Sequence, residues 1–146
     1  MSLWVYTNGI RCVNPILPDC DSNKIVFVGN MRTLQNQDAV VYFVSGIFPL
    51  VKKARPGAVF HIVGDEPPQF IRNMNYAKNI VVSGFVNSVE DEIKDAAVAV
   101  APVRIAAGIQ NKVLISMACG LPVVLTSLIA SAIPELQSGT NCLSRL

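Results

Sequence analysis

The chain has 146 residues, of which 51% are hydrophobic and 15% charged, and its net charge is +2. This length suits one domain with a sizeable buried core. High hydrophobicity combined with low charge argues against intrinsic disorder. The few basic residues are scattered along the chain, so a nucleic-acid partner, which needs a basic stripe, is not expected.

The cysteines and the single histidine argue against a metal site. The four cysteines are Cys12, Cys20, Cys119 and Cys142. They include no CxxC pair, and their wide spacing is typical of reduced thiols in a cytoplasmic protein. His61 has no second histidine to join it in a metal site or a catalytic set. We therefore expect no metal and no cofactor, and no catalytic residue can be assigned.

One uncharged stretch, residues 113–134, is long enough to span a bilayer. Gly120 and Pro122 interrupt it, so a helix, a turn and a buried strand explain it better than a transmembrane segment. The first residues show neither a basic region nor an apolar region of a signal peptide. We therefore expect a cytoplasmic protein with no transmembrane segment.

The elements begin after an extended lead-in, residues 1–23, which is rich in Asn, Pro and Asp. The apolar run 24–29 predicts a buried strand that ends in glycine. The segment 38–54 has helical spacing with basic residues in or just past its last turn, as the helix dipole favours. Pro49 within this segment predicts a kink or a split into two helices.

The alternation of strand and helix then repeats to the end of the chain. Further strands are expected at 58–63, 79–83, 97–101 and 121–125. One helix is expected from the Pro67–Pro68 stretch to about residue 76, and two more are expected over 88–94 and 108–119. Ser88 is the expected N-cap of the second of these helices, and Gly120 the residue that ends the third. Residues 130–136 form at most a short helical turn, and 141–143 are a candidate sixth, edge strand.

Such alternation predicts βαβ units and therefore an α/β fold, with a doubly wound, mostly parallel, Rossmann-like sheet in residues 24–146. Ligands of these sheets bind at the carboxyl ends of the strands. The first three strands each end in a glycine, at Gly29, Gly64 and Gly84. We expect them to border an open crevice in which backbone can hold a flat base.

Charged and apolar residues follow these strand ends. Asn30 and Arg32 come after the first strand, and Phe85 and Val86 after the third. Arg32 is a candidate partner for a phosphate, although a strand-ending turn with a solvated arginine is the commoner explanation. The chain contains neither a GxGxxG nor a GxxxxGK[ST] pattern, so NAD and P-loop chemistry lack support.

The loop after the fourth strand, residues 102–112, is the most informative. Gly108 stands at an expected helix start, where free N–H groups favour an anion. Arg104 and Lys112 bracket that start, so a diphosphate would find two cations together. The alternative, a surface lysine and a loop salt bridge, is equally compatible with the sequence.

The segment KVLISMACGLPVV, residues 112–124, resembles the "KxLEAMAxGxPVV" motif of retaining glycosyltransferases of family 4, which have the GT-B fold. Weaker segments follow the family's order over about residues 7–143. They are Asn8–Ile10, Ile25–Gly29, Phe60–Gly64, Gly84–Val86, Ala101–Pro102, and Pro134 and Glu135 with Gly139 and Asn141.

This resemblance implies the donor-binding, C-terminal half of an enzyme that transfers a sugar from a nucleotide-sugar to an acceptor hydroxyl with retention and without a bound metal. It implies that Gly29 and Gly108 lie near the diphosphate, and Phe85 and Val86 near the base. The candidate site residues are Gly29, Asn30, Arg32, Gly84, Phe85, Val86, Arg104, Gly108 and Lys112. The missing partner is an N-terminal, acceptor-binding domain, so we expect this truncated half to be inactive alone. The resemblance also suggests a role in bacterial polysaccharide biosynthesis, in the cytoplasm or, for the full-length protein, at the periphery of the membrane.

Two alternatives stay open. The two glutamates that the family often carries fall at Ala107 and Ile115 in this chain. Their replacement favours a degenerate, non-catalytic binding module. The other alternative is half of a GT-B-fold sugar-nucleotide epimerase, which would be expected to show additional acid and base residues in the cleft.

Overall fold

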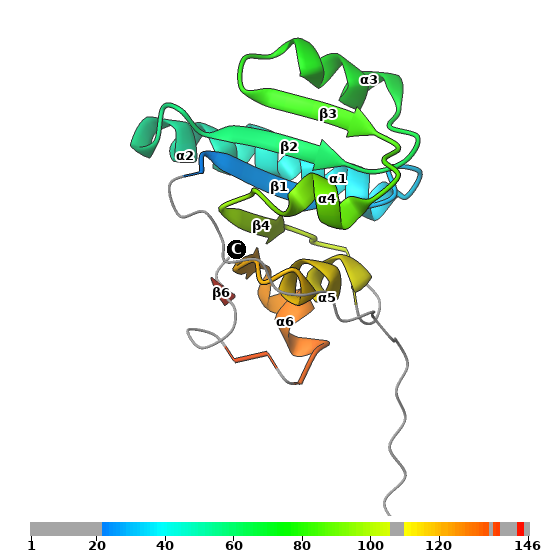
Figure 1. Cartoon of the computed structure of the whole chain (residues 1–146), viewed down its shortest axis with the longest axis vertical. Helices are drawn as coiled ribbons and strands as arrows, with labels where there is room; N and C mark the ends of the chain where they lie inside the picture. Colours follow the sequence, from blue (N-terminus) through cyan, green and yellow to red (C-terminus); the bar gives the residue numbers. More distant parts are fainter. Residues whose placement is uncertain (1–21, 106–109, 135, 138–142, 145–146) are drawn as a thin grey trace, which may run out of the picture.

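The computed structural model describes residues 22–105, 110–134, 136–137 and 143–144. Within these residues the chain forms a six-stranded sheet of order β3-β2-β1-β4-β5-β6, in which all neighbouring pairs are parallel (Figure 1). The strands are β1 (Lys24–Val28), β2 (Val59–Val63), β3 (Ile80–Gly84), β4 (Val98–Ala101), β5 (Val123–Leu125) and β6 (Leu143–Ser144). The order reverses direction between β1 and β4, which makes this the topological switch point of the sheet.

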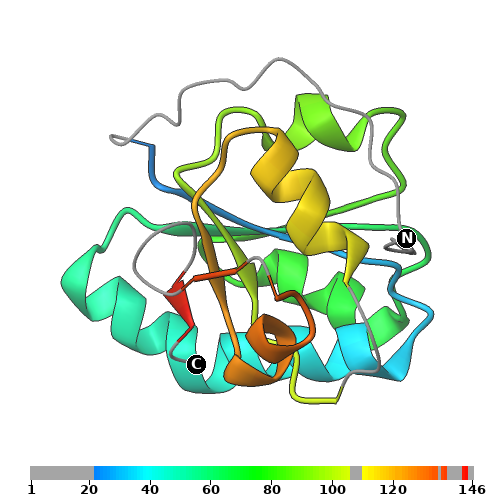
Figure 2. The same cartoon turned by 90° about the horizontal axis from the view of Figure 1, so that it is seen from below.

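Helices cover both faces of the sheet, as the alternating pattern predicted. They are α1 (Leu34–Tyr42), the π-helix η1 (Phe43–Ile47), α2 (Phe48–Ala54), α3 (Gln69–Arg72), the 3-10 helix η2 (Asn73–Tyr76), α4 (Val89–Ile93), α5 (Asn111–Ala118) and α6 (Ser127–Ser131). Helices α1 and α2 lie on one face and α4 and α5 on the other (Figures 1 and 2). The prediction of a doubly wound Rossmann-like sheet is confirmed.

The central strands are apolar because both of their faces are covered by helices. Val26 and Phe27 of β1 and Phe60 and Ile62 of β2 are fully buried. Val26 lies opposite His61 of β2 on one side and Ala99 of β4 on the other. Burial of these side chains supplies the main driving force for folding and fixes the strand ends that carry the site.

The helix predicted over 38–54 differs from the structure at its start and in its middle. It begins at Leu34, after the N-cap residue Thr33, because Asn36, Ala39 and Val40 turn one face into the core. The predicted break appears as the π-helix η1, directly before Pro49 in the first turn of α2.

The π-helix aligns two aromatic side chains. In a regular α-helix, residues five positions apart differ by roughly 140° around the axis. Phe43 and Phe48 nevertheless face the same way, with ring centroids 6.1 Å apart, and both pack on Phe60 at 4.4 and 5.8 Å. The wider turn of η1 provides this alignment.

Helix α5 ends as predicted. Gly120, with φ of +80°, follows the last turn, and two hydrogen bonds close it, from Gly120 N to Met117 O at 2.9 Å and from Leu121 N to Ser116 O at 3.0 Å. This is the Schellman arrangement, which favours glycine. The predicted cap of α4 is also confirmed, since Ser88 Oγ accepts a hydrogen bond from Asp91 N at 3.1 Å.

Three boundaries near the end of the chain differ from prediction. Helix α5 begins at Asn111, because its N-cap Gln110 has extended backbone, and Gly108 lies outside the described residues. The helical turn expected over 130–136 lies at α6, Ser127–Ser131. The sixth strand is at Leu143–Ser144, where it pairs in parallel with β5.

The stretch 113–134 folds as a helix, a turn and a buried strand, as its sequence predicted, followed by the short helix α6. In the described part of the chain, no helix combines the length and the apolar character needed to cross a bilayer.

Candidate functional site

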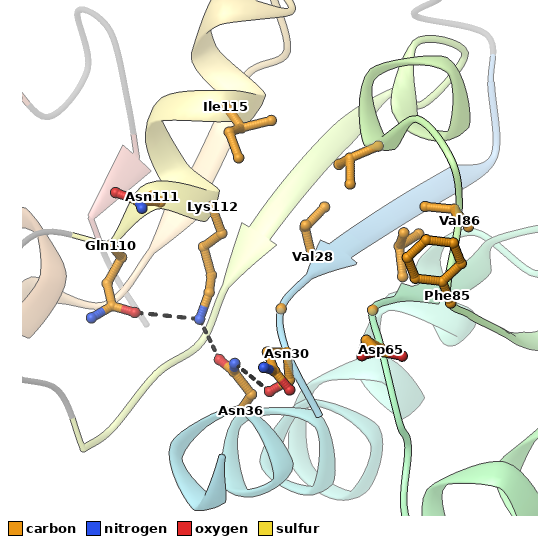
Figure 3. Close-up of a pocket in the computed structure, with 14 residues that line it drawn as sticks. Val28, Asn30, Asn36, Asp65, Phe85, Val86, Gln110, Asn111, Lys112 and Ile115 are labelled. Carbon is orange, nitrogen blue, oxygen red and sulfur yellow. Dashed lines mark hydrogen bonds between the residues drawn. The ribbon is translucent and has the colours of Figure 1, made fainter. Parts of the chain in front are cut away.

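A cavity of about 460 Å³ opens at the carboxyl ends of β1, β2 and β3 and at the start of α5 (Figure 3). Its lining residues are Val28, Gly29, Asn30, Asn36, Val63, Gly64, Asp65, Phe85, Val86, Val89, Gln110, Asn111, Lys112 and Ile115. Elements on both sides of the switch point contribute, which is where open α/β sheets bind their ligands.

Glycines allow the strand ends to approach one another. A Cβ atom on Gly64 would lie 1.7 Å from the carbonyl oxygen of Gly29, and one on Gly29 would lie 2.8 Å from Cγ of Asn36. Gly29 N donates to Val63 O at 2.9 Å, and Gly64 N donates to Gly84 O at 3.1 Å. The three glycines therefore lie along one edge, as the sequence predicted, and the first two leave no room for a side chain.

Lys112 is the basic residue that lines the cavity. It belongs to the first turn of α5, and its ammonium donates to Oδ1 of Asn36 and, at 3.3 Å, to Oε1 of Gln110. Nζ lies 5.2 Å from the centre of the Phe27 ring. Among the described residues, no carboxylate forms an ion pair with it. Burial lowers the pKa of Lys112 to about 8 because the charged form loses hydration.

Asn36 is the residue that orients this lysine. It is buried on α1, and its side-chain amide donates to the carbonyl of Asn30 at 2.8 Å while its oxygen accepts from Lys112. This chain of bonds joins α5, α1 and the loop after β1 across the cavity (Figure 3). Sequence reasoning missed Asn36, and also Gln110, because their partners are set by tertiary contact.

The opposite part of the cavity is apolar. Phe85 is 72% exposed and borders the cavity together with Val28, Val86, Val89 and Ile115. Phe85 and Asp65 also line a second cavity of about 470 Å³, to which Gly84 contributes. The positive φ of Gly84, +70°, turns the chain between β3 and Phe85, and glycine adopts this conformation without strain.

The two arginines of the predicted site lie outside the cavity lining. Arg32 forms ion pairs with Glu66 and, at 3.6 Å, with Asp65. Arg104 donates from Nε to Oδ2 of Asp38 at 3.0 Å and from Nη2 to Oδ1 at 2.5 Å. Its guanidinium also lies 4.5 Å from the centre of the Tyr42 ring. Both therefore adopt the salt-bridge arrangement that the sequence left open as an alternative for Arg104.

Of the candidate residues, the structure brings five together in the cavity lining: Gly29, Asn30, Phe85, Val86 and Lys112. Gly84 lines the neighbouring cavity, and Gly108 lies outside the described residues. His61 lies away from the cavity, where it is buried beside Ser83 and 3.2 Å from Glu92. In the ranges that the structure covers, no three His, Cys, Asp or Glu side chains gather as metal ligands.

Comparisons with known proteins identify a family for the chain. Residues 22–144 match the family model described as glycosyl transferases group 1. No curated protein has significant sequence similarity to the chain.

Solved structures share the fold at low identity. S. aureus TarM has a TM-score of 0.67 and 18% identity, covering 92% of this chain and 28% of its own. A TarM mutant in complex with fondaparinux, α-GlcNAc-glycerol and UDP gives 0.66 and 17%, covering 84% and 25%. The pneumococcal O-GlcNAc transferase GtfA, in complex with UDP and GlcNAc, gives 0.56 and 16%, covering 77% and 23%.

The chain thus spans about a quarter of the length of these proteins. Its Rossmann-like fold is that of one half of a GT-B glycosyltransferase. With the family match over residues 22–144, these findings establish that the chain belongs to the glycosyl transferases of group 1.

Proposed function

We propose that the chain is the donor-binding domain of a retaining, family 4 glycosyltransferase. In the reaction, the bond between the sugar's anomeric carbon and the diphosphate breaks, and a bond to the acceptor oxygen forms. The acceptor proton is released and the nucleoside diphosphate leaves. The observation that carries the proposal is Lys112, a cation without a described carboxylate partner, in a cavity at the switch point of the sheet.

The lining residues suggest how a nucleotide-sugar is held. The diphosphate lies beside Lys112 and the start of α5, where the ammonium and the free N–H groups of the helix attract anions. Gly29 and Asn30 border the same end of the cavity from β1. The base packs against Phe85 and Val86, since an exposed aromatic ring offers a stacking surface to any base.

The residues around the cavity also support a partner domain. Leu34, Phe85 and Ile105, which follow β1, β3 and β4, are 77%, 72% and 60% exposed. All three therefore lie at the carboxyl edge of the sheet, where exposed apolar side chains mark a contact surface. We assign this surface to an N-terminal, acceptor-binding domain of the whole protein, with catalysis between the two.

Calorimetric titration of the chain with UDP, GDP and their sugar conjugates, with and without Mg²⁺, tests the donor site. UDP is the first choice because it is present in the TarM mutant and GtfA complexes. We expect saturable binding that Lys112→Met weakens about 10- to 100-fold, the loss of one charged hydrogen bond. Lys53→Met, at an exposed lysine on α2 outside the cavity, is the matched control.

Two results contradict the proposal. One is the absence of saturable binding for every nucleotide at millimolar concentration, with circular dichroism showing a folded chain. The other is binding that Lys112→Met leaves unchanged. Arg32→Ala and Arg104→Ala test the two remaining cations, and we expect smaller losses from them because Glu66, Asp65 and Asp38 already neutralise their charges.

A further inference from the structure

The hydrogen-bond partners of the Lys112 side chain in the described part of the chain carry no charge. A lysine ammonium has three N–H donors. Two of them go to amide oxygens, Oδ1 of Asn36 and, at 3.3 Å, Oε1 of Gln110. No described carboxylate forms an ion pair with Nζ. When Nζ loses its third proton, the two remaining N–H groups keep both acceptors, so the site holds the uncharged amine as well as the ammonium.

The surroundings of Nζ favour this uncharged amine. Burial lowers the pKa of Lys112 to about 8. Asp65 is the other charged residue among the described lining residues, and it lies across the cavity, near Phe85 (Figure 3). At pH 7.5 about a quarter of Lys112 is therefore uncharged, compared with about 0.1% of a solvated lysine with a pKa near 10.4. Only the amine has the lone pair that attacks an electrophile, and a desolvated lysine is a recognised nucleophile.

The position of Lys112 also selects the kind of electrophile that reaches it. Helix α5, Asn111–Ala118, begins at the cavity, and the first N–H groups of a helix have no partner within it and attract anions. The cavity of about 460 Å³ admits a small molecule. An acyl phosphate joins an anionic phosphate to an activated carbonyl, so the helix start and the ammonium fraction of Lys112 concentrate it beside the amine.

From this geometry we infer that Lys112 is a site of covalent acylation by acyl phosphates. Nζ attacks the carbonyl carbon, and a bond from nitrogen to carbon forms. The bond from that carbon to the phosphate oxygen breaks, inorganic phosphate leaves, and the nitrogen releases a proton to solvent. The product is a neutral amide, which removes the positive charge of Lys112 from the cavity. Acylation therefore shuts off donor binding. This consequence rests on the proposed function, whereas the modification itself does not.

The experiment treats the chain with acetyl phosphate at pH 7.5 and follows each lysine by peptide mass spectrometry. Lys53, exposed on α2, is the comparison within the same molecule. The larger amine fraction of Lys112 is partly offset, because nucleophilicity falls with pKa, as it does for thiols. We expect Lys112 to be acetylated about tenfold or more faster than Lys53. With N-hydroxysuccinimidyl acetate, an uncharged acyl donor, the same order with a smaller margin is expected.

A carboxylate beside Nζ should suppress the reaction. Gln110→Glu keeps the size of the side chain and places a carboxylate where Oε1 lies 3.3 Å from Nζ. The opposite charge favours the ammonium, so acetylation of Lys112 by either reagent should slow by about tenfold, with Lys53 unchanged. Asn111→Asp is the matched control, because its side chain points away from Nζ (Figure 3). With the uncharged reagent it should slow the reaction by less than about threefold. Thermal unfolding checks that both variants are folded.

The outcomes separate the modification from the proposed function. Acetylation of Lys112 and Lys53 at similar rates overturns the inference, and an equal margin with both reagents contradicts the choice of acyl phosphates. Calorimetry on the acetylated chain should show UDP affinity reduced about 10- to 100-fold, as for Lys112→Met, and an unchanged affinity contradicts the effect on donor binding. If UDP and GDP fail to bind the unmodified chain while Lys112 is selectively acetylated, the donor site is wrong and the modification site stands.

Discussion

The carbonyl oxygen of Gly29 occupies the space that a side chain on Gly64 would need, because an ideal Cβ atom there would lie 1.7 Å away. The ends of β1 and β2 are therefore in backbone contact at the edge of the cavity. Such closeness requires glycine at residue 64 for steric reasons, whatever binds in the cavity.

Gly64→Ala is expected to lower the free energy of unfolding by about 3–5 kcal/mol, since backbone has to move to admit the methyl group. Gly46→Ala is the control. Its Cβ would lie 3.8 Å from the Tyr42 ring, and it lies in a helical segment, so we expect a change within about 1 kcal/mol. Urea denaturation measures both, and equal stabilities for the two variants would contradict the packing described for β1 and β2.

Nucleotide affinity should fall at alkaline pH. The pKa of Lys112 is lowered to about 8 by burial, and a phosphate binds the protonated ammonium. Above this pKa the free protein must take up a proton on binding, so affinity should drop by up to about tenfold per pH unit. Calorimetry between pH 7 and 9.5 measures the slope. Lys112→Met should remove it, and an equal slope in this variant would assign the titration to another group.

The stability of the fold should fall as the pH falls below about 6.5. The pKa of His61 is lowered by burial and by the charge of Lys24, partly opposed by Glu92 and Asp95. Below this pH, His61 is protonated more readily in the unfolded chain than in the folded chain, and this difference favours unfolding. Thermal melts between pH 5 and 7.5 should show this dependence. His61→Gln should weaken the dependence in that range, and an unchanged profile would rule out His61 as its source.

Ser88→Ala should destabilise the chain by about 0.5–2 kcal/mol, because it removes the acceptor for Asp91 N at the start of α4. Helix α4 is short, with five residues from Val89 to Ile93, so its cap is a large part of its local stability. Ser45→Ala, where an exposed hydroxyl only donates to the carbonyl of Val41, should change stability little. Comparable losses in the two variants would contradict a specific capping role.

The sheet and much of its site edge could be predicted because local patterns determine them. Apolar runs that end in Gly29, Gly64 and Gly84 mark strand ends, and parallel strands bring those ends to one edge. Lys112 was found because it lies near the start of a helix that follows a strand.

Other features depend on contacts between distant residues. The partner of Arg104 is Asp38, 66 positions earlier, and no local pattern links the two. Asn36 lies in a polar segment that reads as a loop, and only its burial against the strand ends makes it part of the helix and of the site. The alignment of Phe43 and Phe48 likewise depends on a π turn, which apolar spacing alone does not reveal.

That π turn fixes the rotational phase between the two halves of one long helical segment. Asn36 at one end faces the cavity, and Phe48 toward the other faces the aromatic core. Removing one residue within Val44–Ile47 would leave Phe43 and Phe48 four positions apart, a spacing that a regular α-helix already places on one face. The lysine-orienting amide and the phenylalanine cluster would therefore keep their relative orientation after such a deletion, whereas an inserted residue would rotate one half against the other by roughly 100°.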